Sequence, residues 1–206
     1  MAKVYFYYSA MNAGKSTTLL QSSYNYRERG MTTLLFTPLL DDRYQIGTVS
    51  SRIGLKENAT SFDEQFNFYQ HVKKILLTTP DLKCLLIDEA QFLKKAQVKQ
   101  LTLVADKLNI PILAYGLRSD FQGETFEGSQ YLMAWSETIT EIKTICHCGR
   151  KATMNMRIDE QGNMVTKGSQ IEIGGNDRYL PVCRKHFNEA RENAQKLSNL
   201  SAETVI

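Results

Sequence analysis

The segment from Ser9 to Ser16 has the residue types and spacing of a phosphate-binding loop. It reads Ser9, Ala10, Met11, Asn12, Ala13, Gly14, Lys15 and Ser16. In such a loop, backbone N–H groups and a helix N-terminus surround the β- and γ-phosphates, a lysine adds positive charge and a serine hydroxyl binds Mg²⁺. The first position departs from the pattern G-x-x-x-x-G-K-[ST], because Ser9 carries a Cβ where glycine is usual. An apolar run precedes the segment and a helical stretch follows it, so we predict a nucleoside triphosphate site.

Two carboxylates, Asp88 and Glu89, follow directly on an apolar run that has the character of a buried strand. Ligands of open α/β folds bind at the carboxyl ends of the strands. Asp88 there suits the binding of Mg²⁺, and Glu89 is then free to accept a proton from an attacking hydroxyl or water. A solvated acidic turn is the alternative, and the upstream phosphate loop favours the functional interpretation. The pair does not distinguish a kinase from an ATPase, and the lack of an Asn-Lys-x-Asp motif leaves guanine specificity without support.

Four residues near the C-terminus have the spacing of a structural zinc site. Cys146 and Cys148 form one short pair, and Cys183 and His186 form another. Zinc takes four thiolate or imidazole ligands in a tetrahedron, and two chelating pairs at the ends of a loop supply them. We favour a metal over a disulfide for a reducing compartment. His147 is a rival ligand, but its place between two cysteines makes simultaneous chelation awkward, so we favour His186.

The elements that must position these residues form an α/β pattern. Short, unalternating apolar runs predict strands at Val4–Tyr8, Thr32–Phe36, Lys83–Ile87 and Ile110–Tyr115. Helices are predicted at Ser16–Arg29, about 62–78 and Lys94–Leu108. Continuous apolar strands alternating with helices are typical of a parallel sheet covered on both faces. From Cys146 onward, glycine-punctuated short segments predict a hairpin-like subdomain instead.

Composition bounds the class of protein. The chain has 206 residues, of which 42% are hydrophobic and 23% charged, which suits an ordinary globular core. No apolar run reaches the roughly 18–20 residues that span a bilayer, and no signal peptide opens the chain, so we expect a cytoplasmic protein without a membrane partner. The net charge of +3 is too small to indicate a nucleic-acid groove.

Four motifs in order resemble the cellular-type (type II) thymidine kinases over nearly the whole chain. They are the phosphate loop, Asp88-Glu89-Ala90-Gln91-Phe92, Tyr115-Gly116-Leu117-Arg118-Ser119-Asp120-Phe121, and Gly174-Gly175-Asn176-Asp177-Arg178-Tyr179 leading to Cys183. Ser9 in place of the first glycine is similar to the bacterial members. The resemblance implies a RecA-like P-loop sheet and transfer of the γ-phosphate of ATP to the 5′-hydroxyl of thymidine, with deoxyuridine as a second acceptor, and with Mg²⁺. It also implies a zinc-held lasso over the nucleoside, a homotetramer and feedback inhibition by thymidine triphosphate.

The resemblance also assigns roles to individual residues. Glu89 matches the general base, with Lys15 and Arg43 beside the transferring phosphoryl group. ATP binding falls to Ser9–Ser16 together with Asp88, Glu89, Ala90 and Gln91, and Mg²⁺ to Ser16, Asp88 and Asp41, for which Asp42 is a competitor. Thymidine contacts fall to Met11, Leu117, Phe121, Phe126, Gly174, Gly175 and Tyr179.

The expected organisation is a P-loop α/β nucleotide-binding domain over residues 1–141, a zinc-binding lasso subdomain over 142–190 and a polar tail over 191–206. A P-loop ATPase that acts on nucleic acid and grips it with a zinc ribbon is the alternative function. It predicts a basic stripe with stacking aromatic side chains.

Overall fold

A computed structural model describes residues 1–40, 47–170 and 178–203, with side chains to residue 196. The expected site residues Asp41, Asp42, Arg43, Gly174 and Gly175 lie outside the described residues. The chain forms two compact units, which are described separately. The first comprises Met1–Ser9, Gly14–Arg118 and Thr125–Ile142, and the second comprises Ala10–Ala13, Ser119–Glu124 and Lys143–Ile206.

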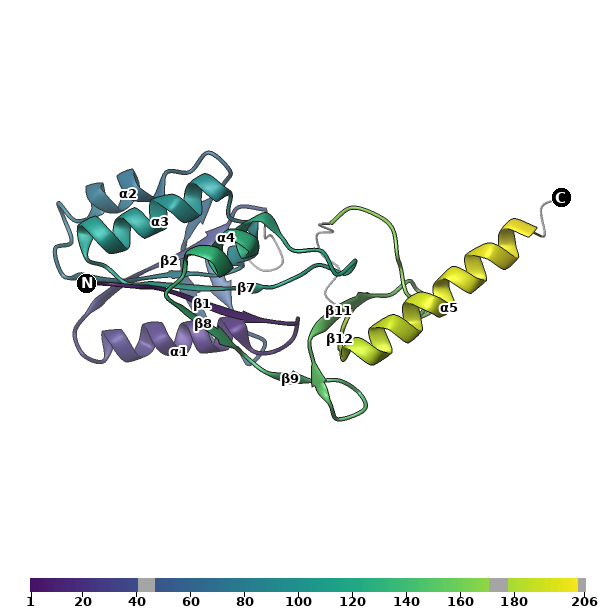
Figure 1. The fold of residues 1–206 in the computed structure, drawn as a ribbon. Helices are drawn as coiled ribbons and strands as arrows, with labels where there is room; N and C mark the ends of the chain where they lie inside the picture. The colour runs from purple at the N-terminus through teal and green to yellow at the C-terminus, as the bar shows by residue number, and fades with distance from the viewer. Residues whose placement is uncertain (41–46, 171–177, 204–206) are drawn as a thin grey trace. The chain divides into compact units, whose positions relative to one another are not determined.

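The first unit is built on a parallel sheet, to which the described residues contribute six strands (Figure 1). Their order across the sheet is β5-β2-β6-β7-β1-β8, and every neighbouring pair is parallel. The strands are β1 Val4–Ser9, β2 Thr32–Pro38, β5 Thr60–Phe62, β6 Leu82–Ile87, β7 Ile112–Leu117 and β8 Thr138–Glu141. A short antiparallel hairpin, β3 Thr48–Ser50 with β4 Lys56–Asn58, lies between β2 and β5 in the chain. The parallel sheet predicted from the apolar runs is confirmed.

Helices cover both faces of this sheet (Figure 1). They are α1 Lys15–Arg27, α2 Phe68–Ile75, the short 3₁₀ helix η1 Ala90–Phe92, α3 Lys95–Leu108 and α4 Glu127–Trp135. Residues of α2, α3 and α4 share one hydrophobic cluster with the sheet, and residues of α1 share another. Strand β6 contributes to both in alternation, since Leu85 and Ile87 belong to the first cluster and Cys84 and Leu86 to the second. Burial on both faces explains why this strand reads as a continuous apolar run.

The helix predicted at about 62–78 begins later than expected. Its first residues form β5 and a loop, and α2 starts only at Phe68. Asn67 ends the loop, because its side chain accepts a hydrogen bond from the Gln70 N–H at 3.0 Å and so caps the helix. The sequence prediction overlooked this cap. It also omitted α4 and β8, which complete the sheet and its helical cover.

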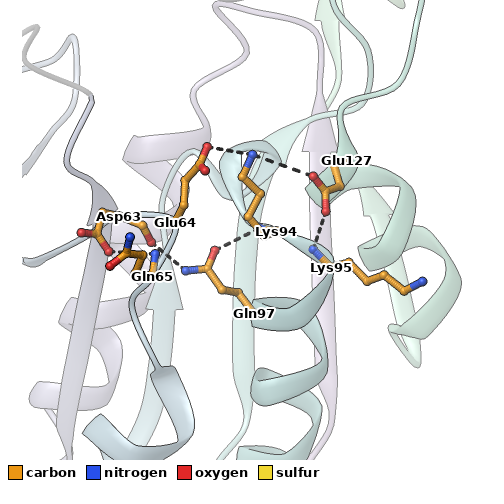
Figure 2. A network of polar contacts seen from close by, with 7 residues as sticks. All are labelled: Asp63, Glu64, Gln65, Lys94, Lys95, Gln97 and Glu127. Atoms are coloured by element: carbon orange, nitrogen blue, oxygen red, sulfur yellow. Dashed lines mark hydrogen bonds and ion pairs between the residues drawn. The ribbon is translucent and has the colours of Figure 1, made fainter.

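Buried and exposed polar contacts hold the start of α3 (Figure 2). Lys94 Nζ lies 2.8 Å from Glu64 and 3.9 Å from Glu127, and the Lys95 N–H donates to Glu127 at 2.8 Å. The side chain of Gln97 accepts the Lys94 N–H at 3.0 Å, and its own amide donates across to the loop before α2. Exposed ion pairs contribute little stability, so the buried Gln97 is the main tie.

The second unit contains two antiparallel hairpins and a long helix, which confirms the hairpin-like pattern predicted after Cys146. Its elements are β9 Thr144–Ile145, β10 Lys151–Ala152, β11 Met154–Arg157, β12 Tyr179–Val182 and α5 Arg184–Glu203. Strand β9 pairs with β10, and β11 with β12. The core is small, with Cys146, Ala152, Met164, Val182, Cys183 and Phe187 buried together. Helix α5 occupies much of the stretch expected to be a polar tail.

None of the described helices is both long enough and apolar enough to cross a membrane.

Candidate active site and metal cluster

The phosphate loop joins β1 to α1, as the sequence predicts. Gly14 precedes α1 with φ 83° and Asn12 has φ 61°, so the loop turns through two left-handed residues. A Cβ on Gly14 would meet no described atom within 4 Å, which means that its backbone angle rather than crowding calls for glycine. Helix α1 begins at Lys15, so its first N–H groups and its positive dipole end lie at the loop, where they favour an anion.

Ser9, which departs from the usual loop pattern, contacts the loop lysine. Lys15 is 8% exposed, and its Nζ lies 3.3 Å from the Ser9 Oγ. The hydroxyl thus helps to accommodate a buried ammonium group, which would be costly without polar partners. The serine at the first position therefore has a structural use, and the loop forms without the usual glycine.

Asp88 lies directly after β6 and extends its pairing with β2, because its N–H donates to the Phe36 carbonyl at 2.9 Å. Its Oδ2 accepts a hydrogen bond from Ser16 Oγ at 3.0 Å. Among the described residues, the buried Oδ1 has no hydrogen-bond partner. An unpartnered carboxylate oxygen beside a hydroxyl matches the ligands that Mg²⁺ prefers. The pair Ser16 and Asp88 therefore fits the magnesium site predicted for them.

Burial raises the pKa of Asp88 from its usual 3.8 to about 7, with the Glu89 charge adding to the effect. The hydrogen bond from Ser16 and the charge of Lys15 act in the opposite direction. A carboxyl group that resists ionisation in this way is stabilised as an anion when a cation binds next to it. The electrostatics of this site thus favour a positively charged ligand at Asp88.

Glu89 and Gln91 form a second buried polar pair. Glu89 is 8% exposed and has φ 47°, a left-handed conformation that ends β6 sharply and starts η1. The Gln91 Nε2 donates to Glu89 Oε2 at 2.5 Å, and its Oε1 accepts the Leu117 N–H at 3.0 Å. A Cβ on Gly116 would come within 2.9 Å of the Gln91 backbone nitrogen, so glycine there allows this close approach. Gln91, expected to bind ATP, therefore holds the carboxylate against the end of β7.

Apolar side chains of the first unit gather near the end of β7. Leu117 is 8% and Phe126 6% exposed, and Phe92 lies edge to face with Phe126 at a ring separation of 5.9 Å. Sequence reasoning missed Phe92, although its place directly after Gln91 was a usable signal. The other expected nucleoside contacts, Met11, Phe121 and Tyr179, belong to the second unit.

Cys146, Cys148, Cys183 and His186 form a cluster in which one ligand atom from each lies within 4.8 Å of the others. All the cysteines are free thiols. The Cys148 and Cys183 sulfurs are 3.9 Å apart, and His186 Nδ1 is 3.3 Å from the Cys146 sulfur. A tetrahedron with zinc–sulfur bonds of about 2.3 Å has sulfur–sulfur edges of roughly 3.8 Å. The four residues could therefore hold a zinc ion, as predicted.

Local backbone geometry prepares the cluster. The Cys146 N–H donates to the Arg150 carbonyl and the Gly149 N–H to the Cys146 carbonyl, both at 2.8 Å, which closes a tight turn around Cys148. Burial disfavours the Cys146 thiolate, but the N–H groups of Cys148 and Cys183 and the His186 ring lower its pKa to about 6. Since the thiolate is the metal-binding form, the turn favours a metal ligand. His147, the rival ligand, stacks on His186 at 4.3 Å.

The parallel sheet, the phosphate loop and the strand-end carboxylates together define an α/β nucleotide-binding protein of the P-loop class. A family model described as thymidine kinase matches residues 2–187. This chain belongs to the thymidine kinase family.

Curated bacterial relatives agree in length as well as in sequence. The thymidine kinase of Legionella pneumophila (strain Lens) is 62% identical over 187 residues, which cover 91% of this chain and 90% of the relative. The thymidine kinase of Coxiella burnetii is 60% identical over 91% of this chain and 95% of the relative. The thymidine kinase of Vibrio vulnificus (strain YJ016) is 62% identical over 92% of this chain and 98% of the relative. A solved structure of Pif1 helicase from Candida albicans aligns with a TM-score of 0.45 and 15% identity over 70% of this chain, which spans 36% of that chain.

The pKa of Asp88 predicts a pH-dependent stability. Between its unfolded pKa of about 3.8 and its folded pKa of about 7, the folded state keeps a proton that the unfolded state has lost, so this contribution to stability decreases as pH rises through that window. We expect Asp88→Asn to melt about 4 °C or more above wild type at pH 8 without nucleotide, and the difference to be clearly smaller at pH 5 and to close only below the unfolded pKa of 3.8. Calorimetry at the two pH values measures it, and a difference that is equal at both would contradict the assignment.

The cluster predicts about one zinc ion per chain. We expect Cys183→Ser to lose the metal and to lower the melting temperature, because a structural zinc site can contribute about 10–16 kcal/mol of apparent binding free energy. Metal analysis and thermal melting test this, with Cys84→Ser as the matched control outside the cluster. Purified wild-type protein without zinc, or full retention in Cys183→Ser, would rule the site out.

Proposed function

We propose that this protein transfers the γ-phosphate of ATP to the 5′-hydroxyl of thymidine, giving thymidine monophosphate and ADP, with deoxyuridine as a possible second acceptor. One observation carries the proposal: in a chain of the thymidine kinase family, Ser16 and Asp88 are directly hydrogen-bonded across the end of the sheet, with Glu89 next in sequence. Phosphoryl transfer depends mainly on positioning and charge stabilisation, and this edge supplies both.

The phosphates are held by the loop in this proposal. N–H groups at the start of α1 face the anion, and Lys15 offsets charge on the transferring group. Ser16 and Asp88 would hold Mg²⁺, which neutralises the phosphate oxygens when bound. Asp41 and Arg43, outside the described residues, stay proposals for a further metal-side acid and a further cation, and Asp42 competes with Asp41.

Glu89 is the proposed general base. Its carboxylate would accept the proton of the 5′-hydroxyl as that oxygen attacks the γ-phosphorus, and the bond to the leaving ADP oxygen breaks. The Gln91 amide donates to one of the Glu89 carboxylate oxygens, Oε2, and so favours one orientation of the carboxylate. Tethering the base in this way limits its rotamers and keeps it aimed at one position.

The thymine base is proposed to lie among Met11, Leu117, Phe121, Phe126 and Tyr179, with the backbone at Gly174 and Gly175 reading its edge. The half-buried Phe92 joins this group because it contacts Phe126. A homotetramer, feedback inhibition by thymidine triphosphate, a structural zinc ion and a cytoplasmic location belong to the same proposal, with family membership or the cysteine cluster as support.

The alternative of a nucleic-acid ATPase has less support. Lys95 and Lys99, both on α3, lie over the rings of Tyr131 and Trp135 at 4.9 and 5.6 Å. Those rings are thus already in contact with cations of the same chain. The family match favours a nucleoside acceptor over a nucleic acid.

An assay of ADP release with each of the four common deoxynucleosides tests the proposal directly. We expect Mg²⁺-dependent turnover with thymidine. Release of ADP that does not depend on any nucleoside would indicate an ATPase instead.

Replacing the proposed base tests its role. We expect Glu89→Gln to lower kcat by roughly 10²-fold or more with little change in ADP binding, because the amide keeps the shape but cannot accept the proton. Glu137→Gln is the control, since Glu137 accepts the Val4 N–H at the opposite end of β1. Normal turnover of Glu89→Gln at neutral pH would exclude Glu89 as the base.

The hydrogen bond from Gln91 to Glu89 predicts an effect on the proposed base that can be separated from an effect on protein stability. We expect Gln91→Leu to lower kcat by about 10-fold and to change the pH dependence of kcat, because Glu89 loses the donor that holds its ionised form. Gln97→Leu is the matched control, since Gln97 is equally buried but contacts the loop before α2. Both variants should lose stability. If they changed the pH profile equally or not at all, Gln91 would have only a structural role.

A further inference from the structure

Asn155 is a buried amide in the middle of β11, within the second unit. It is 2% exposed, and the strand alternates so that Asn155 and Arg157 are buried while their neighbours are less so. Asparagine is unfavourable in strands, and a buried polar side chain is costly unless it is hydrogen-bonded. Its presence there calls for specific partners.

Both ends of the Asn155 amide are hydrogen-bonded to backbone groups of distant segments. Its Oδ1 accepts the N–H of Met11 at 2.7 Å, and its Nδ2 donates to the carbonyl of Ser119 at 2.8 Å. These partners are 144 and 36 residues away in sequence. A side chain with one acceptor and one donor at this length satisfies both, and a carboxylate or an apolar group of the same shape does not.

The first contact fixes the middle of the phosphate loop. Met11 belongs to the four residues, Ala10–Ala13, that cluster with the second unit while the ends of the loop belong to the first. Backbone N–H groups of such loops face the bound phosphates, whereas the Met11 N–H is taken by Asn155. The conformation of this part of the loop therefore depends on a strand of the metal-cluster unit.

The second contact fixes the start of the segment that carries Phe121. Ser119 precedes Asp120, whose buried carboxylate accepts the N–H groups of Gln122 and Glu124 at 2.8 and 2.9 Å and so closes a tight turn. Arg157, two residues along β11, lies over the Phe121 ring at 3.6 Å. One strand thus holds both the loop and this turn.

The metal cluster lies at the end of the same hairpin. Asn155 is paired with Pro181 of β12, and Cys183 follows β12 directly. The Thr153 N–H donates to the Val182 carbonyl at 3.0 Å, which carries the pairing to the cluster. The backbone pairing of the hairpin therefore connects Asn155 to Cys183 and the metal cluster.

We propose that Asn155 is a positioning residue that holds Met11 in the conformation required for nucleotide binding, so that the hairpin next to the cysteine cluster positions this part of the phosphate loop. This inference rests on the proposed function, since it assigns the loop to ATP. Both hydrogen bonds of the Asn155 amide go to backbone groups. Asn155 acts through the Met11 backbone.

Three variants that keep the number of side-chain heavy atoms of asparagine separate this role from simple stability. Asn155→Leu removes both hydrogen bonds, and Asn155→Asp keeps an acceptor for Met11 but loses the donor to Ser119. Asn163→Leu is the control, because Asn163 is an exposed asparagine of the Asp159–Asn163 turn in the same unit. Calorimetric binding of Mg²⁺-ADP, the KM for ATP, kcat with thymidine and the melting temperature are measured for each.

We expect Asn155→Leu to bind Mg²⁺-ADP about 10-fold more weakly and to lose about 10- to 100-fold in kcat/KM for ATP, since small misplacements in a positioned site have costs of this size. Asn155→Asp should recover ADP affinity to within about 3-fold of wild type even if it melts as low as the leucine variant. The control should stay within about 2-fold.

Two outcomes would overturn the proposal: wild-type ADP affinity in folded Asn155→Leu, or equal loss of affinity in the Leu and Asp variants. ADP binding needs no acceptor, so the comparison can be read independently of thymidine. A wild-type protein that binds Mg²⁺-ADP but does not phosphorylate thymidine would overturn the proposed function and leave the positioning role standing.

Discussion

A buried carboxylate at the end of β6 constrains the catalytic edge of this protein. Removing an ionised group from water is expensive, and the Ser16 hydroxyl, the Lys15 charge and the Glu89 N–H compensate for it only in part. Its raised pKa is the result of this imbalance. A bound cation with oxygen-preferring chemistry would reduce this cost.

Buried amides tie separate segments of the chain together within each unit. Gln91 joins Glu89 to the end of β7, Gln97 joins the start of α3 to the loop before α2, and Asn155 joins the phosphate loop to the Ser119 segment. Each of these amides donates one hydrogen bond and accepts another, so each favours a single arrangement of the two segments that it joins. These ties also explain the glycine at position 116, where a side chain would collide with the Gln91 backbone.

The second unit depends on a different source of stability. Its apolar core is small, and two of the buried residues in it are the cysteines Cys146 and Cys183. Small cores seldom suffice by themselves, and a metal site is one of the usual supplements. The cluster, the two hairpins and the start of α5 then act as a single support for the residues on β11.

The sequence by itself determined the local chemistry: the phosphate loop, the strand-end carboxylates, the four metal-type ligands and the buried strands. These features are encoded in contiguous residues or short spacings. Strand β6 is an example, because its burial on both faces favours a run of apolar side chains that is visible in the sequence. Tertiary structure alone decided that Ser9 contacts Lys15, that Phe92 meets Phe126, and that α2 starts after a cap at Asn67. It also decided that Asn155 lies against Met11, 144 residues away. Such contacts depend on which strands become neighbours. Strand pairing is determined by burial across the whole chain, so no local spacing in the sequence predicts it.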